Sequence, residues 1–205
     1  MKNRYYFFIP VCLLFFYSFT NSNYEKKKIS NKLYSFSVPE NWTPNLPPEI
    51  SDDGFTPGER DAYKYHLYYL LWSNSSKNLN RFISLFIESY NRLDNQPLSI
   101  KEIEDVEMDK MKLTEKSGNL KILERKEIKG KSGQKRFIIK EESIEIDVKK
   151  GGKMVKHSRI YLLQKNGNIV HCACIFVPEE YYLLPETQGV IDDILDSFSV
   201  NSGKN

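Results

Sequence analysis

The sequence has few of the residues on which metal and thiol chemistry depend. Its 205 residues include three cysteines and three histidines, which are His66, His157 and His171. A metal site needs three or four converging ligands. The histidines stand far apart in the chain, and the strand pattern described below places His157 and His171 on opposite faces of a sheet. We therefore expect neither a bound metal nor a cofactor.

Motifs for nucleophilic and phosphate chemistry are also missing. No Gly-x-Ser-x-Gly elbow occurs. Gly130-Lys131-Ser132 lacks the glycine that a phosphate-binding loop carries five residues earlier, where Arg125 stands. Carboxylates are numerous but show no obvious buried pair. We expect a protein that is not an enzyme, with a hydrolase of unrecognised type as an alternative.

The longest hydrophobic run lies at the N-terminus. Lys2 and Arg4 precede an apolar stretch from Tyr5 to Phe19, and the small or polar residues 20–22 follow it. This order predicts a secretory signal peptide over residues 1–22, because a stable membrane span needs about twenty apolar residues. The protein is then exported, to the periplasm or outside the cell. The alternative is a membrane anchor, through an uncleaved N-terminus or lipidation of Cys12.

The chain has no charge excess of one sign. Its 30 basic and 27 acidic residues give a net charge of +3, and loss of Lys2 and Arg4 leaves 28 against 27, or +1. A nucleic-acid-binding protein usually carries a basic face, so we expect no nucleic-acid partner.

Only Cys172 and Cys174 remain after cleavage. Two residues apart on a strand, they face the same side about 7 Å from each other, and we interpret them as small core residues without a disulfide.

Strand and loop patterns open the mature chain. The lysine-rich segment 23–32 is predicted to be a linker. Tyr34, Phe36 and Val38 then alternate with polar residues, which predicts a half-buried strand. Residues 43–61 contain four prolines and two glycines and are predicted to form a long loop. Further strands are predicted over residues 63–72 and 81–90.

Two helices and an antiparallel meander follow. Ser99 and Glu102 fit a capping box at the start of an amphipathic helix over 99–113, and residues 185–198 carry a second apolar stripe. Gly151-Gly152 and Asn166-Gly167 are predicted hairpin turns. These turns place Ile144, Tyr161 and Cys172 on one face of the sheet. Both faces are apolar at the centre, so each needs a covering layer.

The order of these motifs resembles that of the PsbP-like superfamily over about residues 33–200. The resemblance rests on an opening strand, a mid-chain glycine and a closing helix: Tyr34, Phe36, Val38, Pro39, Trp42, Gly130, Ile194, Leu195, Ser197 and Phe198. It implies an α+β fold in which an antiparallel β-sheet of about six to seven strands is sandwiched by helices. The 43–61 loop departs from this pattern. The superfamily includes photosystem II subunits, bacterial envelope lipoproteins and partner-binding proteins, so the resemblance implies a binding or adaptor role in the cell envelope.

Aromatic residues give the best candidate for a functional surface. They cluster in one predicted strand: Tyr63, Tyr65, Tyr68, Tyr69 and Trp72. Tyrosine buries a large apolar area while its hydroxyl keeps a hydrogen bond, which suits partner recognition. We expect this surface to bind another cell-envelope protein, although the same residues could instead pack in the core. A small-ligand or lipid carrier, with a pocket between sheet and helix, is the alternative.

Overall fold

The computed structural model describes residues 24–30, 33–44, 56–57, 63–73, 82–92, 94, 96–147 and 151–201. It describes the backbone alone for 43–44, 56–57, 63–73, 82, 145–147 and 151. The predicted signal segment 1–22 and most of the predicted 43–61 loop lie outside the described residues. Within the described part, none of the helices has the length and apolar character that crossing a membrane requires.

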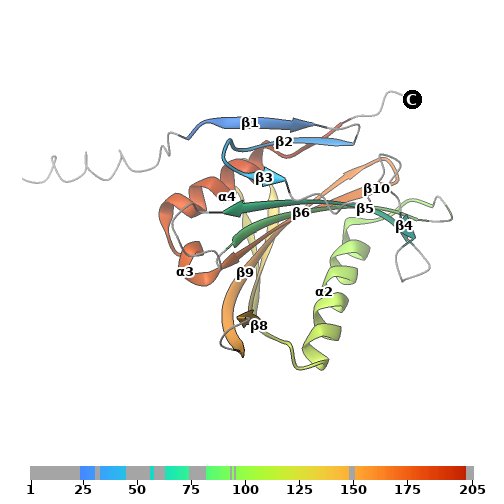
Figure 1. The fold of residues 1–205 in the computed structure, drawn as a ribbon. Helices are drawn as coiled ribbons and strands as arrows, with labels where there is room; N and C mark the ends of the chain where they lie inside the picture. Colours follow the sequence, from blue (N-terminus) through green and yellow to red (C-terminus); the bar gives the residue numbers. More distant parts are fainter. Residues whose placement is uncertain are drawn as a thin grey trace, which may run out of the picture.

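A twisted antiparallel sheet forms the centre of the fold (Figure 1). Its strands run in the order β3-β5-β6-β10-β9-β8-β7, and β4 pairs with β5 beside β3. Their bounds are β3 Thr43–Pro44, β4 Thr56–Pro57, β5 Tyr63–Ser73, β6 Phe82–Arg92, β7 Leu120–Lys129, β8 Lys135–Asp147, β9 Gly151–Asn166 and β10 Ile169–Pro178. The second half of the chain is thus the meander that the sequence predicts.

One face of this sheet packs against β2 (Tyr34–Pro39) and α4 (Pro185–Ser197). Tyr34, Phe36 and Val38 are all buried, which confirms the predicted alternation. Helix α4 begins with Pro185, whose fixed φ suits a first helical turn, and it buries the apolar stripe predicted for it. Each buried side chain of this size contributes ~1.5–3 kcal/mol, so this core contributes substantially to the stability. The short helix α3 (Glu179–Tyr182) precedes α4.

A separate three-stranded sheet lies over this core, in the order β1-β2-β11, with β1 at Lys26–Ser30 and β11 at Ser199–Val200. The prediction that 23–32 is a linker is wrong over β1. Ile29 lies in register with Phe36 and packs against the core, and Lys26 pairs with Asp193 at 2.8 Å. The lysines indicated a solvated linker, but an edge strand also tolerates exposed lysine on its polar side.

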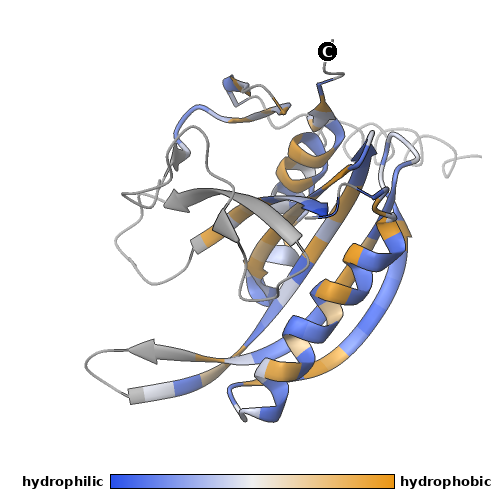
Figure 2. Ribbon diagram, turned by 90° about the vertical axis from the view of Figure 1, so that its right-hand side faces the viewer, coloured by the Kyte–Doolittle hydropathy of each residue, from blue (hydrophilic) through white to orange (hydrophobic). Residues whose placement is uncertain are grey.

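Helix α2 (Ile100–Lys116) covers part of the opposite face of the large sheet (Figure 2). The predicted capping box is present: Glu102 N donates to Ser99 Oγ at 3.1 Å and Ser99 N donates to Glu102 Oε2 at 2.9 Å. Ile103 and Met111 are buried against the sheet. The α+β fold class, with helices on both faces of an antiparallel sheet, is therefore confirmed.

The register between β8 and β9 differs from the predicted one. Asp147 pairs with Gly151 and Ile144 with Met154, so the two glycines lie in β9. An odd shift in register exchanges the two faces of a strand. Phe137 therefore stacks on Tyr161, with ring centroids 4.6 Å apart, and this stacking favours the observed register. The predicted placement of Ile144 on the face of Tyr161 is wrong, and the side chain of Ile144 is 41% exposed.

Candidate functional site

The five aromatic residues predicted as a partner-binding surface all lie on β5: Tyr63, Tyr65, Tyr68, Tyr69 and Trp72. Their side chains lie outside the described part of the chain, but the backbone register divides them between the two faces of the sheet. Tyr65 pairs with Tyr90 and Tyr69 with Phe86, on the α2 face, where Tyr63 also belongs. Tyr68 and Trp72 belong to the face that carries the main core. The structure thus brings three of the five to one face.

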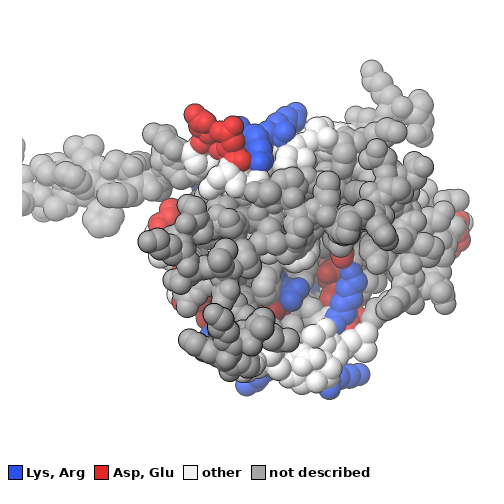
Figure 3. Space-filling model, in the orientation of Figure 1, with Lys and Arg blue, Asp and Glu red and all other residues white. Residues whose placement is uncertain are grey.

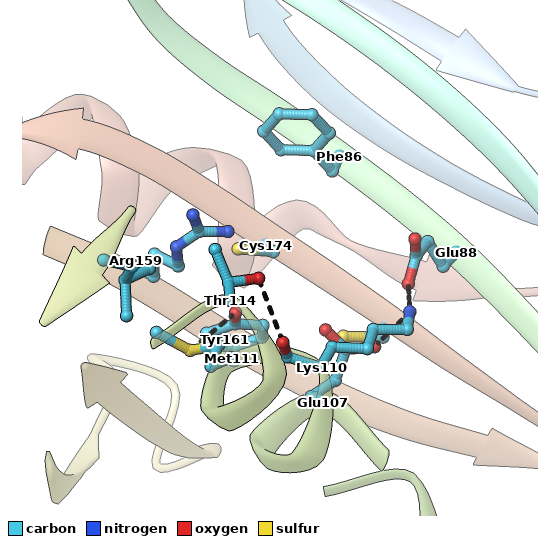
Figure 4. Close-up of a pocket in the computed structure, with 11 residues that line it drawn as sticks. Phe86, Glu88, Glu107, Lys110, Met111, Thr114, Arg159, Tyr161 and Cys174 are labelled. Atoms are coloured by element: carbon cyan, nitrogen blue, oxygen red, sulfur yellow. Dashed lines mark hydrogen bonds and ion pairs between the residues drawn. The ribbon is translucent and has the colours of Figure 1, made fainter. Parts of the chain in front are cut away.

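A cavity of about 230 Å³ lies on that same face, between α2 and the sheet (Figure 4). Its walls come from α2, β6, β9, β10 and the start of β7: Phe86, Glu88, Glu107, Lys110, Met111, Thr114, Leu120, Arg159, Tyr161, Cys172 and Cys174. Figure 3 shows a hollow in the surface where basic and acidic side chains lie next to one another. The residues that could hold a ligand thus begin one strand inward from β5, on β6.

Strand alternation and helical spacing explain this lining. Cys172 and Cys174 are two residues apart on β10, so both face α2, and Tyr161 lies opposite Cys174 on β9. On α2, Glu107 and Met111 are four residues apart and face the sheet together. The floor is therefore apolar and sulfur-rich, and the charged groups gather at its sides.

A compact polar cluster joins α2 to β6 at one side of the cavity. The Tyr90 hydroxyl donates to Glu107 Oε1 at 2.5 Å and also contacts Glu88. The Lys110 ammonium donates to Glu88 Oε2 and to Glu107 Oε1, both at 2.9 Å, and lies 5.1 Å from the centre of the Tyr90 ring. Two carboxylates therefore share one ammonium.

The two carboxylates respond differently to their surroundings. Burial, followed by the charge of Glu88, raises the pKa of Glu107. Burial also acts to raise the pKa of Glu88, but the Lys110 ammonium and the hydrogen bonds with Tyr90, Lys110 and Glu107 outweigh it, so this pKa is lowered. The pair therefore binds one proton more tightly than either of two separate glutamates would.

A second ion pair closes the other side of the cavity. Arg159 Nε donates to Glu141 Oε2 at 2.6 Å and its Nη2 donates to Glu141 Oε1 at 3.1 Å. Glu141 is completely buried, and the guanidinium lies 4.8 Å from the ring centre of Phe176. A two-point arrangement of this kind fixes both the position and the charge of the guanidinium.

The two cysteines are free and buried, as the sequence predicts. Burial raises the pKa of Cys174 to about 12 and raises that of Cys172 well above its usual range. Since the thiolate is the nucleophile and the metal ligand, both side chains act as apolar floor near neutral pH. In the ranges that the structure describes, no three His, Cys, Asp or Glu residues converge as a metal site would require.

The histidines are distributed as predicted. His157 and His171 lie on opposite faces of the large sheet. His171 faces the main core, where its Nδ1 lies 2.8 Å from Ser89 Oγ. By backbone register His66 pairs with Ser89 as well, so it belongs to the same row of the sheet.

The polar cluster was missed in the sequence, where no buried carboxylate pair was expected. One signal could have found Glu107: it stands four residues after Ile103 and four before Met111, in the middle of the apolar stripe of α2. Glu88 and Arg159 have no comparable signal, because polar residues also alternate on ordinary half-exposed strands.

No protein family and no curated protein matches this sequence. Among solved structures, the chain is similar to the cyanobacterial PsbP of Synechocystis sp. PCC 6803, with 12% identity and a TM-score of 0.48 over 86% of this chain and 92% of that one. It is also similar to Mog1p, a Ran-binding protein of Saccharomyces cerevisiae, with 14% identity and a TM-score of 0.43 over 87% and 96%. The chain is similar as well to a protein of Bacteroides thetaiotaomicron VPI-5482, with 12% identity and a TM-score of 0.39 over 87% of this chain and 50% of that one. The likeness to PsbP agrees with the resemblance in the sequence, and it concerns the fold alone.

Proposed function

We propose that this is a non-catalytic binding protein whose ligand occupies the cavity between α2 and the large sheet. The observation that carries the proposal is the cavity itself, about 230 Å³ in volume, with an apolar floor and charged sides. Ligand sites commonly combine apolar walls with a few fixed polar groups. At about 30 Å³ per water, the space suits a ligand of roughly eight non-hydrogen atoms, or one end of a larger molecule.

The chemistry of the lining supports binding rather than catalysis. The raised pKa values of Cys172 and Cys174 leave both thiols protonated near neutral pH. Glu141 is held by Arg159 in a two-point ion pair. Among the described residues that line the cavity, neither thiol is an activated nucleophile, and this supports a role in holding a molecule unchanged.

A protein partner on β5 is the second candidate, and the register of the sheet favours it. Tyr63, Tyr65 and Tyr69 share the face of the cavity and lie one strand further out. A partner covering this face would contact both the tyrosines and the mouth of the cavity. Triple replacement of these tyrosines by alanine is expected to remove a co-purifying protein partner, and retention of every partner would exclude this candidate.

Export to the cell envelope is also part of the proposal. It is supported by the basic residues Lys2 and Arg4 followed by the apolar run 5–19. The intact mass of the protein isolated from its source tests it directly. A chain that begins near Asn23 agrees with cleavage, whereas one that keeps Met1 or carries a lipid on Cys12 indicates a membrane anchor.

Ligand entry can be tested with two tryptophan variants of α2. Thr114 lines the cavity at its exposed edge, so Thr114→Trp is expected to fill the mouth. Leu113 is 55% exposed and does not line the cavity, which makes Leu113→Trp the matched control. The probe is n-hexanol, and its binding is measured by chemical-shift changes in NMR spectra of the protein. Binding should be lost in the first variant and kept in the second; equal binding by both would refute the assignment of the cavity.

A further inference from the structure

We infer that the ligand carries one positively charged amine on a small apolar body, and that this amine binds between Glu88 and Glu107. This inference rests on the proposed function, because it names the ligand class of the same cavity. Among the side chains that the structure describes there, three carboxylates, those of Glu88, Glu107 and Glu141, face two cations, Lys110 and Arg159.

The two cations are not free to balance this excess. Arg159 is matched by Glu141 through two hydrogen bonds. Lys110 is shared by Glu88 and Glu107, and it uses one oxygen of each, Oε2 and Oε1 respectively. Glu88 Oε1 and Glu107 Oε2 accept none of these bonds. When all groups are ionised, one negative charge therefore remains, and it lies on this carboxylate pair.

A proton or a cation can neutralise this remaining charge. Burial and the charge of Glu88 raise the pKa of Glu107, so without a ligand a proton neutralises the pair up to a higher pH than it would an exposed glutamate. A bound ammonium would take its place: the carboxylic acid releases its proton to solvent, and the ammonium hydrogens donate to the carboxylate oxygens. Hydrogen bonds between ionised groups are among the strongest in proteins. An anion would instead meet two carboxylates in a poorly solvated site.

The groups around the pair show how an ammonium is accommodated there. Lys110 itself places an ammonium against both carboxylates and 5.1 Å from the centre of the Tyr90 ring, a distance at which a cation is attracted to the ring face. The rest of the cavity, with Phe86, Met111 and Leu120 among its walls, suits a short hydrocarbon body.

The described titratable and charged side chains around the pair come from four elements: Glu88 and Tyr90 of β6, Glu107 and Lys110 of α2, Arg159 and Tyr161 of β9, and Cys172 and Cys174 of β10. Burial and the negative charge of Glu107 both raise the pKa of Tyr90, Tyr161 and the two thiols. These groups stay neutral near pH 7, so Glu107 is the member of the set whose proton a bound ammonium displaces.

The experiment compares three probes of equal chain length on the full chain: n-hexylamine, n-hexanol and hexanoate. We expect the amine to bind at least about tenfold more tightly than the alcohol, and hexanoate to bind most weakly. The affinity for the amine should rise as pH rises through the raised pKa of Glu107, because less proton must then be displaced. The affinity for the alcohol should not change with pH.

Two variants separate the charge effect from folding. In Glu107→Gln the amine should lose its advantage while n-hexanol still binds, which shows that the cavity is intact. Glu124→Gln is the matched control, since Glu124 also pairs with a lysine, Lys140, but stands outside the cavity. If amine and alcohol bind equally to the unmodified protein, the inference is wrong and cavity binding stands. If none of the three probes binds, both the inference and the proposed function are wrong.

Discussion

The burial of His171 predicts how much the free energy of unfolding falls in acid. Its side chain is 1% exposed, its Nδ1 lies 2.8 Å from Ser89 Oγ, and its ring meets Tyr34 edge-on at 5.8 Å. Burial lowers the pKa of His171 from its ordinary value of 6.5 to about 4. The imidazole is therefore neutral in the folded protein over a range in which the unfolded chain already binds a proton.

The direction and size of the effect follow from proton linkage. Between about pH 6.5 and pH 4 the unfolded state holds the extra proton, so the free energy of unfolding falls as pH falls. A lowering by about 2.5 pKa units, at 1.36 kcal/mol per unit, corresponds to about 3 kcal/mol. A loss of this size is a large fraction of the 5–15 kcal/mol typical of folded domains.

Urea unfolding at pH 7 and pH 4 measures this term in the unmodified protein and in His171→Gln. Glutamine can keep a hydrogen bond to Ser89 but cannot titrate. The variant should be less stable at pH 7, yet it should lose about 3 kcal/mol less than the unmodified protein on going to pH 4. An NMR titration of the imidazole gives the pKa directly. Equal acid losses in both proteins, or a His171 pKa near 6.5, would refute the reasoning.

Three further substitutions test the packing. Gly130→Ala would place a Cβ 2.5 Å from the guanidinium of Arg136, which is fixed by Asp192 and Asp196, and we expect a loss of ~1–3 kcal/mol in urea unfolding. Arg136→Met should destabilise by about 3 kcal/mol, since it removes the ion pair of Asp196 and leaves Asp192 only the more distant Lys131 at 3.7 Å. In this background Gly130→Ala should cost less, and additive losses would contradict the contact. Ser99→Ala removes the N-cap of α2 and should cost ~1 kcal/mol by the same measurement; no change would contradict the cap.

Local sequence patterns were sufficient to predict those elements whose signals lie within a few residues of one another. The alternation of Tyr34 and Phe36 gave a buried strand, and Ser99 gave the start of α2, because both signals lie within a few residues. The strand β1 was missed because its pairing depends on backbone hydrogen bonds to β2 rather than on its own lysine-rich sequence. The β8–β9 register was missed because contacts between distant residues, such as Phe137 and Tyr161, favour it over the glycine pair.

The candidate site shows the same limit. The tyrosines of β5 were predicted to form a binding surface because they make a dense local cluster. The strand register places only part of that cluster on the α2 face. The charged pair Glu88–Glu107 joins two elements, β6 and α2, whose packing no local spacing specifies. Glu107 alone carries a sequence signal, as a charged residue inside an apolar helical stripe.

The central claim is that the cavity under α2 binds a ligand, and intermolecular nuclear Overhauser effects test it most directly. With n-hexanol bound to the full chain, we predict contacts from the probe to the Met111 methyl group and the Phe86 ring, which both line the cavity. Contacts confined to exposed apolar residues such as Leu183, which is 64% exposed, would contradict the claim.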